Sequence, residues 1–127
     1  MIDAGAVITP AMDGVKVVVL LIGVSKYDHV APLRNAVNDA DLFAKLARPI
    51  ENSRVIMVRD GTKVTIEEGI AQFLAELGPG VVAVFAFAGH GLQVDGTNFL
   101  VPRDYNNPTG DKAFLKDHTV SLQHVQE

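Results

Sequence analysis

The sequence predicts an α/β domain with a mainly parallel sheet, and two observations support this fold class. First, the mainly aliphatic and β-branched runs at 16–24 and 81–88 are typical of strands buried on both faces, and residues 54–59 have the pattern of a further short strand between them. Second, two segments with the apolar spacing of helices, 35–47 and 66–77, lie between these runs. Since parallel strands are joined by such crossovers, the expected order is strand, helix, strand, helix, strand.

The composition is that of a single globular domain. The chain has 127 residues, of which 48% are apolar, and this is enough for one hydrophobic core. Residues 1–14 contain Gly5, Pro10 and Gly14 and are expected to be a loose lead-in. We therefore place the domain at residues 15–127.

Charge and the absence of cysteine argue against several classes of protein. The net charge is −4 and Lys and Arg form no block, which argues against a nucleic-acid or membrane-surface partner. The apolar run at 17–24 is too short to span a bilayer, and no signal peptide begins the sequence. The lack of cysteine excludes disulfides and cysteine-based zinc sites, and it is in keeping with a cytoplasmic protein.

The first half of the chain has clear boundaries between its expected elements. The first strand leads into a loop at 25–34, and Asn35 is the expected cap of a helix that ends near Ala47. The strand at 54–59 ends in Asp60-Gly61, a turn pair.

The second half is less regular. Thr65 and Glu68 form a predicted capping box at the start of the second helix. After the third strand, residues 98–101 are expected to be a short extended piece and residues 103–118 a loop. Ser121 is the expected cap of a further helix.

His90 is the sharpest candidate for a catalytic residue. It follows the strand at 81–88 and lies between Gly89 and Gly91, so we expect it at the carboxyl end of the sheet, where ligand sites of such folds gather. A histidine in such a cleft can titrate near neutral pH and act as a general base. By itself, however, a Gly-His-Gly sequence is more often a structural histidine in a turn.

Four pieces of the sequence together resemble the caspase-like peptidases of bacteria, which are relatives of metacaspases in the caspase clan. They are VVLLIGV at 18–24 with Ser25-Lys26-Tyr27, PLRNAVNDADLFAKLA at 32–47, VFAFAGHGLQ at 84–93 and NFLVPRD at 98–104. All four follow in the family's order, and the resemblance covers about residues 15–127. It implies a three-layer αβα caspase-like fold and a cysteine-type endopeptidase.

The resemblance also assigns roles to particular residues. His90 matches the catalytic histidine, and Gly91 lies where the family's loop backbone contributes to the oxyanion site. Asp39 matches an acidic residue of the primary specificity pocket in relatives that cleave after basic residues, which favours Arg or Lys before the scissile bond. The alternative for Asp39 is an acid in a first helical turn that interacts with the helix dipole. Asp28, in the loop beside the expected cleft, is a further substrate-binding candidate, and a solvated Asp28-His29 pair is its alternative.

The chain departs from the family pattern because it has no nucleophile. In caspases the catalytic cysteine follows the histidine by about 50 residues, which corresponds here to a position beyond the end of the sequence. The expectation is a domain truncated before the strand that would carry the nucleophile. Ser25 and Ser121 do not replace it, since one follows the first strand and the other is an expected cap. Because loss of the nucleophile costs roughly a millionfold in turnover, we expect no peptidase activity from this chain alone.

No cofactor or metal is expected. His118 and His124 are poorly spaced for a shared metal on a helix. Asp95, Asp104 and Asp111 lack the ligand spacing of a calcium loop, so calcium activation has no support from spacing.

The truncated fold leads to a prediction about partners. In the resembling fold the strand at 81–88 lies beside the nucleophile strand, so here it is expected to be an uncharged, unpaired edge. Such an edge favours a homodimer through residues 81–88, or an exchange of residues 103–127 between two copies.

Three functions therefore stay open. The first is a caspase-family cysteine endopeptidase domain with Arg or Lys specificity, here without its nucleophile. The second is a non-catalytic caspase-like module that binds or regulates a protein partner as a dimer. The third, an unrelated small α/β binding domain, is disfavoured because no glycine-rich phosphate-binding motif follows the first strand.

Overall fold

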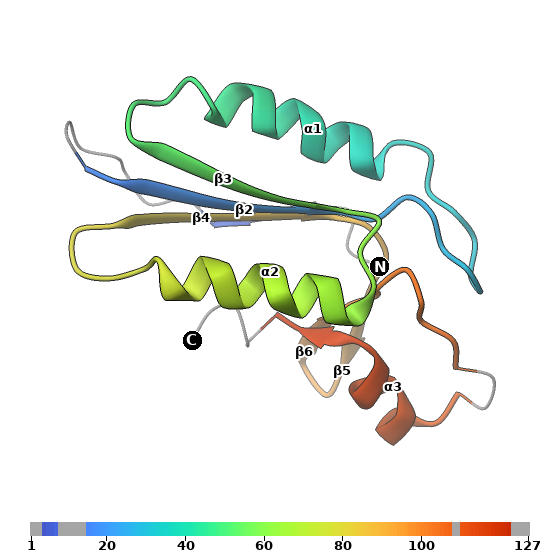
Figure 1. Ribbon diagram of the computed structural model, residues 1–127. Helices are drawn as coiled ribbons and strands as arrows, with labels where there is room; N and C mark the ends of the chain where they lie inside the picture. Colours follow the sequence, from blue (N-terminus) through green and yellow to red (C-terminus); the bar gives the residue numbers. More distant parts are fainter. Residues whose placement is uncertain (1–3, 8–14, 108–109, 123–127) are drawn as a thin grey trace.

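A central sheet lies between two helices in the computed structural model, which describes residues 4–7, 15–107 and 110–122 (Figure 1). The sheet has the order β1-β4-β2-β3, with β1 at Ala4–Val7, β2 at Val17–Gly23, β3 at Ser53–Arg59 and β4 at Val82–Ala88. Helix α1, at Ala36–Ala47, covers one face, and α2, at Lys63–Ala75, covers the other (Figure 1). This arrangement confirms the predicted α/β fold with three layers.

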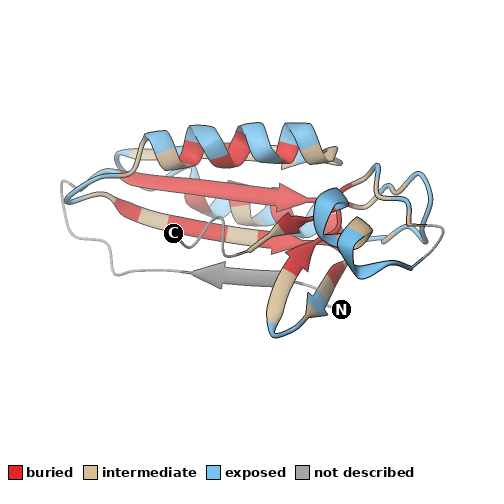
Figure 2. Cartoon of the chain, turned by 90° about the horizontal axis from the view of Figure 1, so that it is seen from below, coloured by how far each residue is buried: buried red, intermediate tan, exposed pale blue. Residues whose placement is uncertain are grey.

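Three neighbouring strands, β4, β2 and β3, are parallel, as the sequence predicts. Val19 of β2 lies opposite Val55 of β3 on one side and Val84 of β4 on the other. Every residue of β2 is buried, which explains why its sequence shows no polar alternation. Of its two neighbours, β4 is mostly buried, whereas Ile56 is the one buried residue of β3; Figure 2 colours each described residue by its burial.

Each face of the sheet has its own hydrophobic core. Toward α2, the buried residues of β2 and the helix include Val18, Leu20, Ile22, Ile66, Ile70 and Phe73. Toward α1, they include Val17, Val19, Leu21, Ala44 and Ala47. The buried face of α1 consists of alanines, so this helix can lie close to the sheet. Gly23 allows the same approach, since a Cβ there would lie 2.9 Å from the Cβ of Ala40.

The predicted boundaries of α1 are confirmed, but its predicted cap is not. Asn35 occupies the N-cap position without a side-chain hydrogen bond to the helix. The hydroxyl of Ser25 instead accepts the amide hydrogen of Val37 at 2.9 Å. The loop after β2 thus supplies a partner for an amide of the first turn that local sequence cannot reveal.

Helix α2 begins earlier than predicted, and the capping box of Thr65 and Glu68 is wrong. Thr62 is the N-cap, with an extended backbone and a side chain that accepts the amide of Thr65 at 3.3 Å. A carboxylate oxygen of Asp104 accepts the amide of Lys63 at 3.0 Å, so a distant segment also caps this helix.

A second, smaller sheet follows β4, of which the sequence predicts only the extended piece at 98–101, now β6. It has the order β5-β6-β7, with β5 at Gly91–Val94, β6 at Thr97–Leu100 and β7 at Val120–Ser121. Asp95 and Gly96 form the turn of the β5-β6 hairpin, with φ angles of 51° and 80°. Both angles are positive, as the favoured two-residue hairpin turn requires, and Asp-Gly is a preferred pair for it.

Two predictions for the last part of the chain are wrong. Helix α3, at Lys112–His118, lies within the predicted loop at 103–118, and the side chain of Asp111 caps it by accepting the amide of Ala113 at 2.8 Å. Ser121 is a strand residue opposite Phe99 rather than a helix cap. The rest of the helix predicted after Ser121 lies at 123–127, outside the described residues.

The prediction that β4 is an unpaired edge is also wrong. Residues 4–7, which were expected to belong to a loose lead-in, form β1 and pair antiparallel with Phe85–Ala88. The chain thus covers the carboxyl half of this edge with its own residues, and the argument for a homodimer through residues 81–88 loses its premise there.

In the parts of the chain that the structure describes, no helix is long and apolar enough to cross a membrane.

Candidate functional site

Four segments meet at the carboxyl ends of the parallel strands. They are the loop at 25–34 after β2, the turn at 60–62 after β3, the turn at 89–90 after β4, and the segment at 101–105 after β6. The site of an open parallel sheet is expected at this edge, because the loops that follow the strands converge there. His90 lies in one of these segments, as predicted from the sequence.

His90 is held at three points by groups from other segments. Its amide donates to the hydroxyl oxygen of Tyr27 at 2.8 Å, and its carbonyl oxygen accepts the amide of Val101 at 3.0 Å. The imidazole Nε2 lies 2.7 Å from the carbonyl oxygen of Ala31. The ring of Tyr27 also packs against the imidazole, with centroids 4.7 Å apart and planes tilted by 49°.

The contact with Ala31 decides which imidazole nitrogen can act as a base. A carbonyl oxygen only accepts hydrogen bonds, so Nε2 of His90 must carry the hydrogen. In the neutral ring Nδ1 then carries the lone pair. A carbonyl that fixes the tautomer of a histidine in this way is a common feature of general bases.

Tyr27 is half-buried beneath this turn and stays protonated. Burial raises the pKa of its phenol to about 12, the backbone hydrogen bond from His90 opposes that shift, and the charge of Asp60 adds to it. The hydroxyl therefore remains a neutral group over the physiological pH range.

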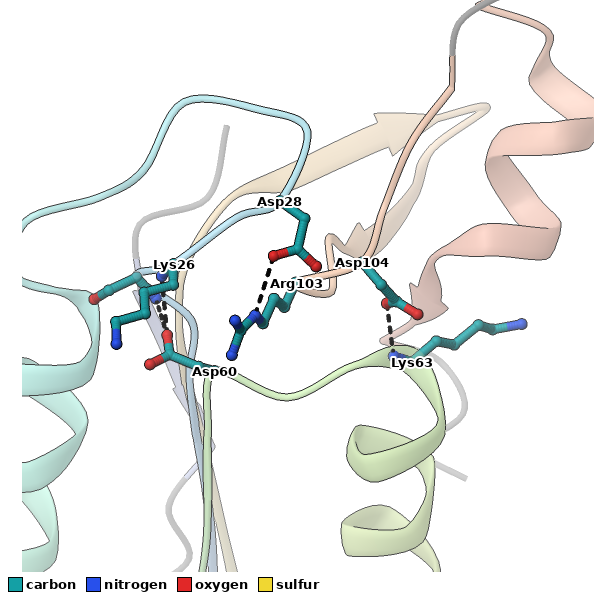
Figure 3. Close-up of polar contacts among 7 residues, drawn as sticks. Lys26, Asp28, Asp60, Lys63, Arg103 and Asp104 are labelled. Atoms are coloured by element: carbon teal, nitrogen blue, oxygen red, sulfur yellow. Dashed lines mark hydrogen bonds and ion pairs between the residues drawn. The ribbon is translucent and has the colours of Figure 1, made fainter.

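Asp60 anchors the loop that carries Tyr27 and Ala31. One of its carboxylate oxygens accepts the amides of both Ser25 and Lys26 at 2.9 Å (Figure 3). Its own amide donates to the carbonyl of Gly23 at 2.8 Å. Asp60 has a φ angle of 48°, a backbone conformation that Asp tolerates better than most residues do.

The segment at 101–105 ties the same loop to the start of α2. Arg103 accepts the amide of Asp28 at its carbonyl and donates its own amide to the carbonyl of Gly61, at 3.0 and 2.9 Å. Beside it, Asp104 caps α2 through Lys63 (Figure 3). The NFLVPRD segment thus links the loop after β2 to the turn before α2 through hydrogen bonds.

Asp28 and Asp39, the two predicted substrate-binding carboxylates, lie in different surroundings. Asp28 is exposed and forms an ion pair with Arg103, whose Nε lies 3.3 Å from its Oδ1 (Figure 3). Asp39 is exposed in the first turn of α1 and lines a cavity of about 300 Å³ between this helix and β4. The cavity is otherwise apolar and reaches Ala88, two positions before His90.

The remaining candidate residues make contacts that stabilise local structure. Gly91 is buried at the start of β5, opposite Leu100. Asp95 lies within 4 Å of both Lys112 and Lys116, Asp111 caps α3, and His118 stacks on Phe114. Within residues 4–7, 15–107 and 110–122, no three His, Cys, Asp or Glu side chains are grouped so that they could hold a metal ion. His124 lies outside the described residues.

Sequence reasoning missed the groups that hold His90. The sequence predicts a loop for Tyr27 and a turn for Asp60, and it indicates no contact of either with His90. A signal existed for both, since each follows a predicted parallel strand at its carboxyl end. The carbonyl of Ala31 has no side-chain signature and could not be found in this way.

Comparisons with known proteins agree on one family. The sequence model of the peptidase C14 caspase domain matches residues 16–126. The mucosa-associated lymphoid tissue lymphoma translocation protein 1 of Homo sapiens is 32% identical over 91 residues, which are 72% of this chain and 11% of that protein. Its homolog from Mus musculus matches over the same share at 32% identity. The chain therefore spans about a tenth of the length of these two relatives, which limits the likeness to one domain.

Proposed function

The chain belongs to the caspase domain family, and we propose on that premise that it supplies the histidine and the specificity pocket of a cysteine endopeptidase site. One observation carries the proposal. His90 is fixed at the carboxyl end of the sheet with Nε2 on the carbonyl of Ala31, and two positions earlier Ala88 lines a cavity in which Asp39 is the one charged residue among the described lining residues.

The proposed role of His90 is that of general base and then general acid. In a thiol peptidase, the neutral imidazole takes the proton of the cysteine as its sulfur attacks the peptide carbonyl, and returns it to the leaving amine. With Nε2 bound to Ala31, this proton passes through Nδ1. We assign the stabilisation of the tetrahedral oxyanion to the backbone around Gly91, as the family resemblance implies.

Asp39 is the proposed specificity residue. The cavity that it lines is formed by apolar side chains, among them Leu42, Phe43 and Leu46. The aliphatic stem of an Arg or Lys side chain fits such a lining, and its charged end would pair with the carboxylate. Asp28 is a weaker candidate because its carboxylate already pairs with Arg103.

The sequence contains no cysteine, so this chain by itself lacks the nucleophile of the proposed reaction. At this edge of the sheet the Ser25 hydroxyl is engaged with α1, where it accepts the amide hydrogen of Val37. We therefore propose that the chain is inactive unless a thiol is supplied by residues outside these 127. The proposed setting is cytoplasmic, and the bacterial branch of the family stays a prediction.

A cleavage assay tests this proposal. The chain is incubated with fluorogenic peptides that end in Arg or Lys before the reporter, together with a His90→Ala variant as control. The expected result is no cleavage above the rate of the control. Cleavage by the chain that is lost in His90→Ala would show that another group serves as nucleophile and would overturn the inactive assignment.

A second candidate function is a non-catalytic module that binds a protein partner. The observation in its favour is a second apolar cavity, of about 200 Å³, which shares Phe43 and Leu46 with the first along the same side of α1. Leu42 and Leu46 are 59% and 69% exposed, which is unusual for large apolar side chains that lie side by side. A homodimer stays a prediction under this alternative, although β1 now occupies the edge first expected to form it.

A further inference from the structure

Tyr27 contacts both the main chain and the side chain of His90 across 63 positions of sequence. We propose that Tyr27 is a positioning residue for His90, which keeps the imidazole in the orientation where Nε2 faces the carbonyl of Ala31. This inference rests on the proposed role of His90 as the base of a peptidase-type site. It assigns to Tyr27 no contact with substrate.

The turn at 89–90 packs closely against Tyr27. The hydroxyl of Tyr27 accepts the His90 amide at 2.8 Å, while the phenol ring lies against the imidazole. A Cβ on Gly89 would lie 3.0 Å from the same hydroxyl oxygen and 2.7 Å from Cζ of Phe87. The turn is therefore packed directly on Tyr27, and this explains why a glycine precedes His90.

Tyr27 and Ala31 belong to one closed loop. The amide of Leu33 donates to the carbonyl of Ser25 at 2.8 Å, which closes the loop at its base. Tyr27 thus sets the position of the His90 backbone, while Ala31, four residues later, receives Nε2. The histidine is oriented relative to a single unit rather than to two independent segments.

This loop is fixed to the sheet immediately before Tyr27. Asp60 accepts the amides of Ser25 and Lys26, so the two residues preceding Tyr27 are both bound to a carboxylate at the end of β3. Hydrogen bonds to an ionised acceptor are stronger than those between neutral groups. The arrangement transmits the rigidity of the sheet to the phenol hydroxyl.

The phenol of Tyr27 is a neutral group beside His90. Because burial raises the pKa of Tyr27 to about 12, the phenol is neutral at the pH where an imidazole titrates. Tyr27 can therefore hold His90 without placing a charge beside it. Removing its hydroxyl changes the geometry of the site and leaves its charge unchanged.

The test uses Tyr27→Phe in the whole 127-residue chain and Tyr105→Phe, at the other tyrosine of the sequence, as the matched control. Nitrogen-15 NMR of the imidazole reports the tautomer, and amide exchange reports the His90 hydrogen bond. In Tyr27→Phe we expect His90 amide exchange to become roughly two- to tenfold faster, the usual range for one lost hydrogen bond. We also expect the Nε2-H tautomer to give way to a mixture, whereas Tyr105→Phe leaves both signals unchanged.

Unchanged tautomer and amide exchange of His90 in a folded Tyr27→Phe chain would overturn the proposal. Exchange of the β2 amides serves as the reference for the fold, since a merely structural role would change these amides and His90 together. If Tyr27→Phe does not fold, Asp60→Gly provides the second variant, because glycine tolerates the positive φ here and removes the acceptor of the Ser25 and Lys26 amides. No change at His90 in that variant also contradicts the proposal. Neither readout requires cleavage, so failure of the proposed peptidase role is seen separately in the peptide assay.

Discussion

At the scale of single residues, the site depends on a few groups that hold one histidine. His90 has its amide, its carbonyl and its ring nitrogen each bound to a different residue. Tyr27 binds the His90 amide, and burial raises the pKa of its phenol to about 12. Its titration therefore gives a direct measure of whether the turn is packed as described.

We predict that the chain loses stability at alkaline pH through Tyr27. The unfolded phenol ionises near pH 10 and the folded one near 12, so between these values the unfolded chain has released a proton that the folded chain still holds. The stabilising contribution is complete below pH 10 and disappears as the pH rises through 12. Urea midpoints at a series of pH values should fall in this window, and the fall should be shallower in Tyr27→Phe. An equal slope in both chains would contradict the burial of the phenol.

The position of His90 was predictable from the sequence, but the hydrogen bonds that hold it were not. A buried apolar run followed by Gly-His-Gly is a local pattern, and the carboxyl end of a parallel strand is where such a residue acts. The bonds to Tyr27 and Ala31 come from a loop about sixty positions away, and one of them is a backbone carbonyl. Contacts of this kind depend on how distant loops come together, which local sequence patterns do not predict.

At the scale of elements, the helices and strands follow their sequence patterns where an apolar face of the element is buried in the core. β2, β4 and α1 lie where the apolar runs and alanine spacing predict them. The β5-β6 hairpin was missed although Asp95-Gly96 is a turn signal, because its strands are short and carry Gln93 and Asn98. The N-terminal residues were missed because four residues form a strand only when an edge is there to pair with.

The packing of α1 on β2 leads to a prediction about Gly23. A Cβ at this position would meet the Ala40 Cβ at 2.9 Å and the Ala36 carbonyl oxygen at 3.1 Å, so Gly23→Ala must push the helix away from the sheet. We expect a loss of about 1–3 kcal/mol in the free energy of unfolding, as for other overpacked cores. Gly78→Ala is the control, since nothing lies within 4 Å of a Cβ there. Equal stability of the two variants in denaturant unfolding would show that α1 does not approach the sheet so closely.

At the scale of the whole molecule, the chain combines two hydrophobic core clusters with an open apolar side. Among the described residues, one helix covers each face of the central sheet. The cavities beside α1 and the exposed Leu42 and Leu46 lie on one side of it. The edge of β4 next to these cavities is covered over Phe85–Ala88 by β1.

We predict that removal of residues 1–7 increases self-association. The deletion takes away β1 and exposes the backbone of an uncharged strand, which is a template for pairing with another chain. Light scattering after size-exclusion chromatography should find the shortened chain in larger species than the intact chain at the same micromolar concentration. If the two chains have the same mass distribution, β1 does not protect this edge in solution.

The claim that His90 and Asp39 belong to one peptide-binding site is tested most directly by peptide binding. NMR titration with a peptide that ends in Arg should shift the signals of His90 and of the cavity beside Asp39 more strongly than a matched peptide that ends in Leu. Asp39→Asn should weaken binding of the Arg peptide by about three- to tenfold, the effect of one exposed charge-assisted contact. Asp41→Asn, on the same helix but paired with Arg59, should leave binding unchanged. Equal binding of both peptides, or an equal effect of the two substitutions, would contradict the account.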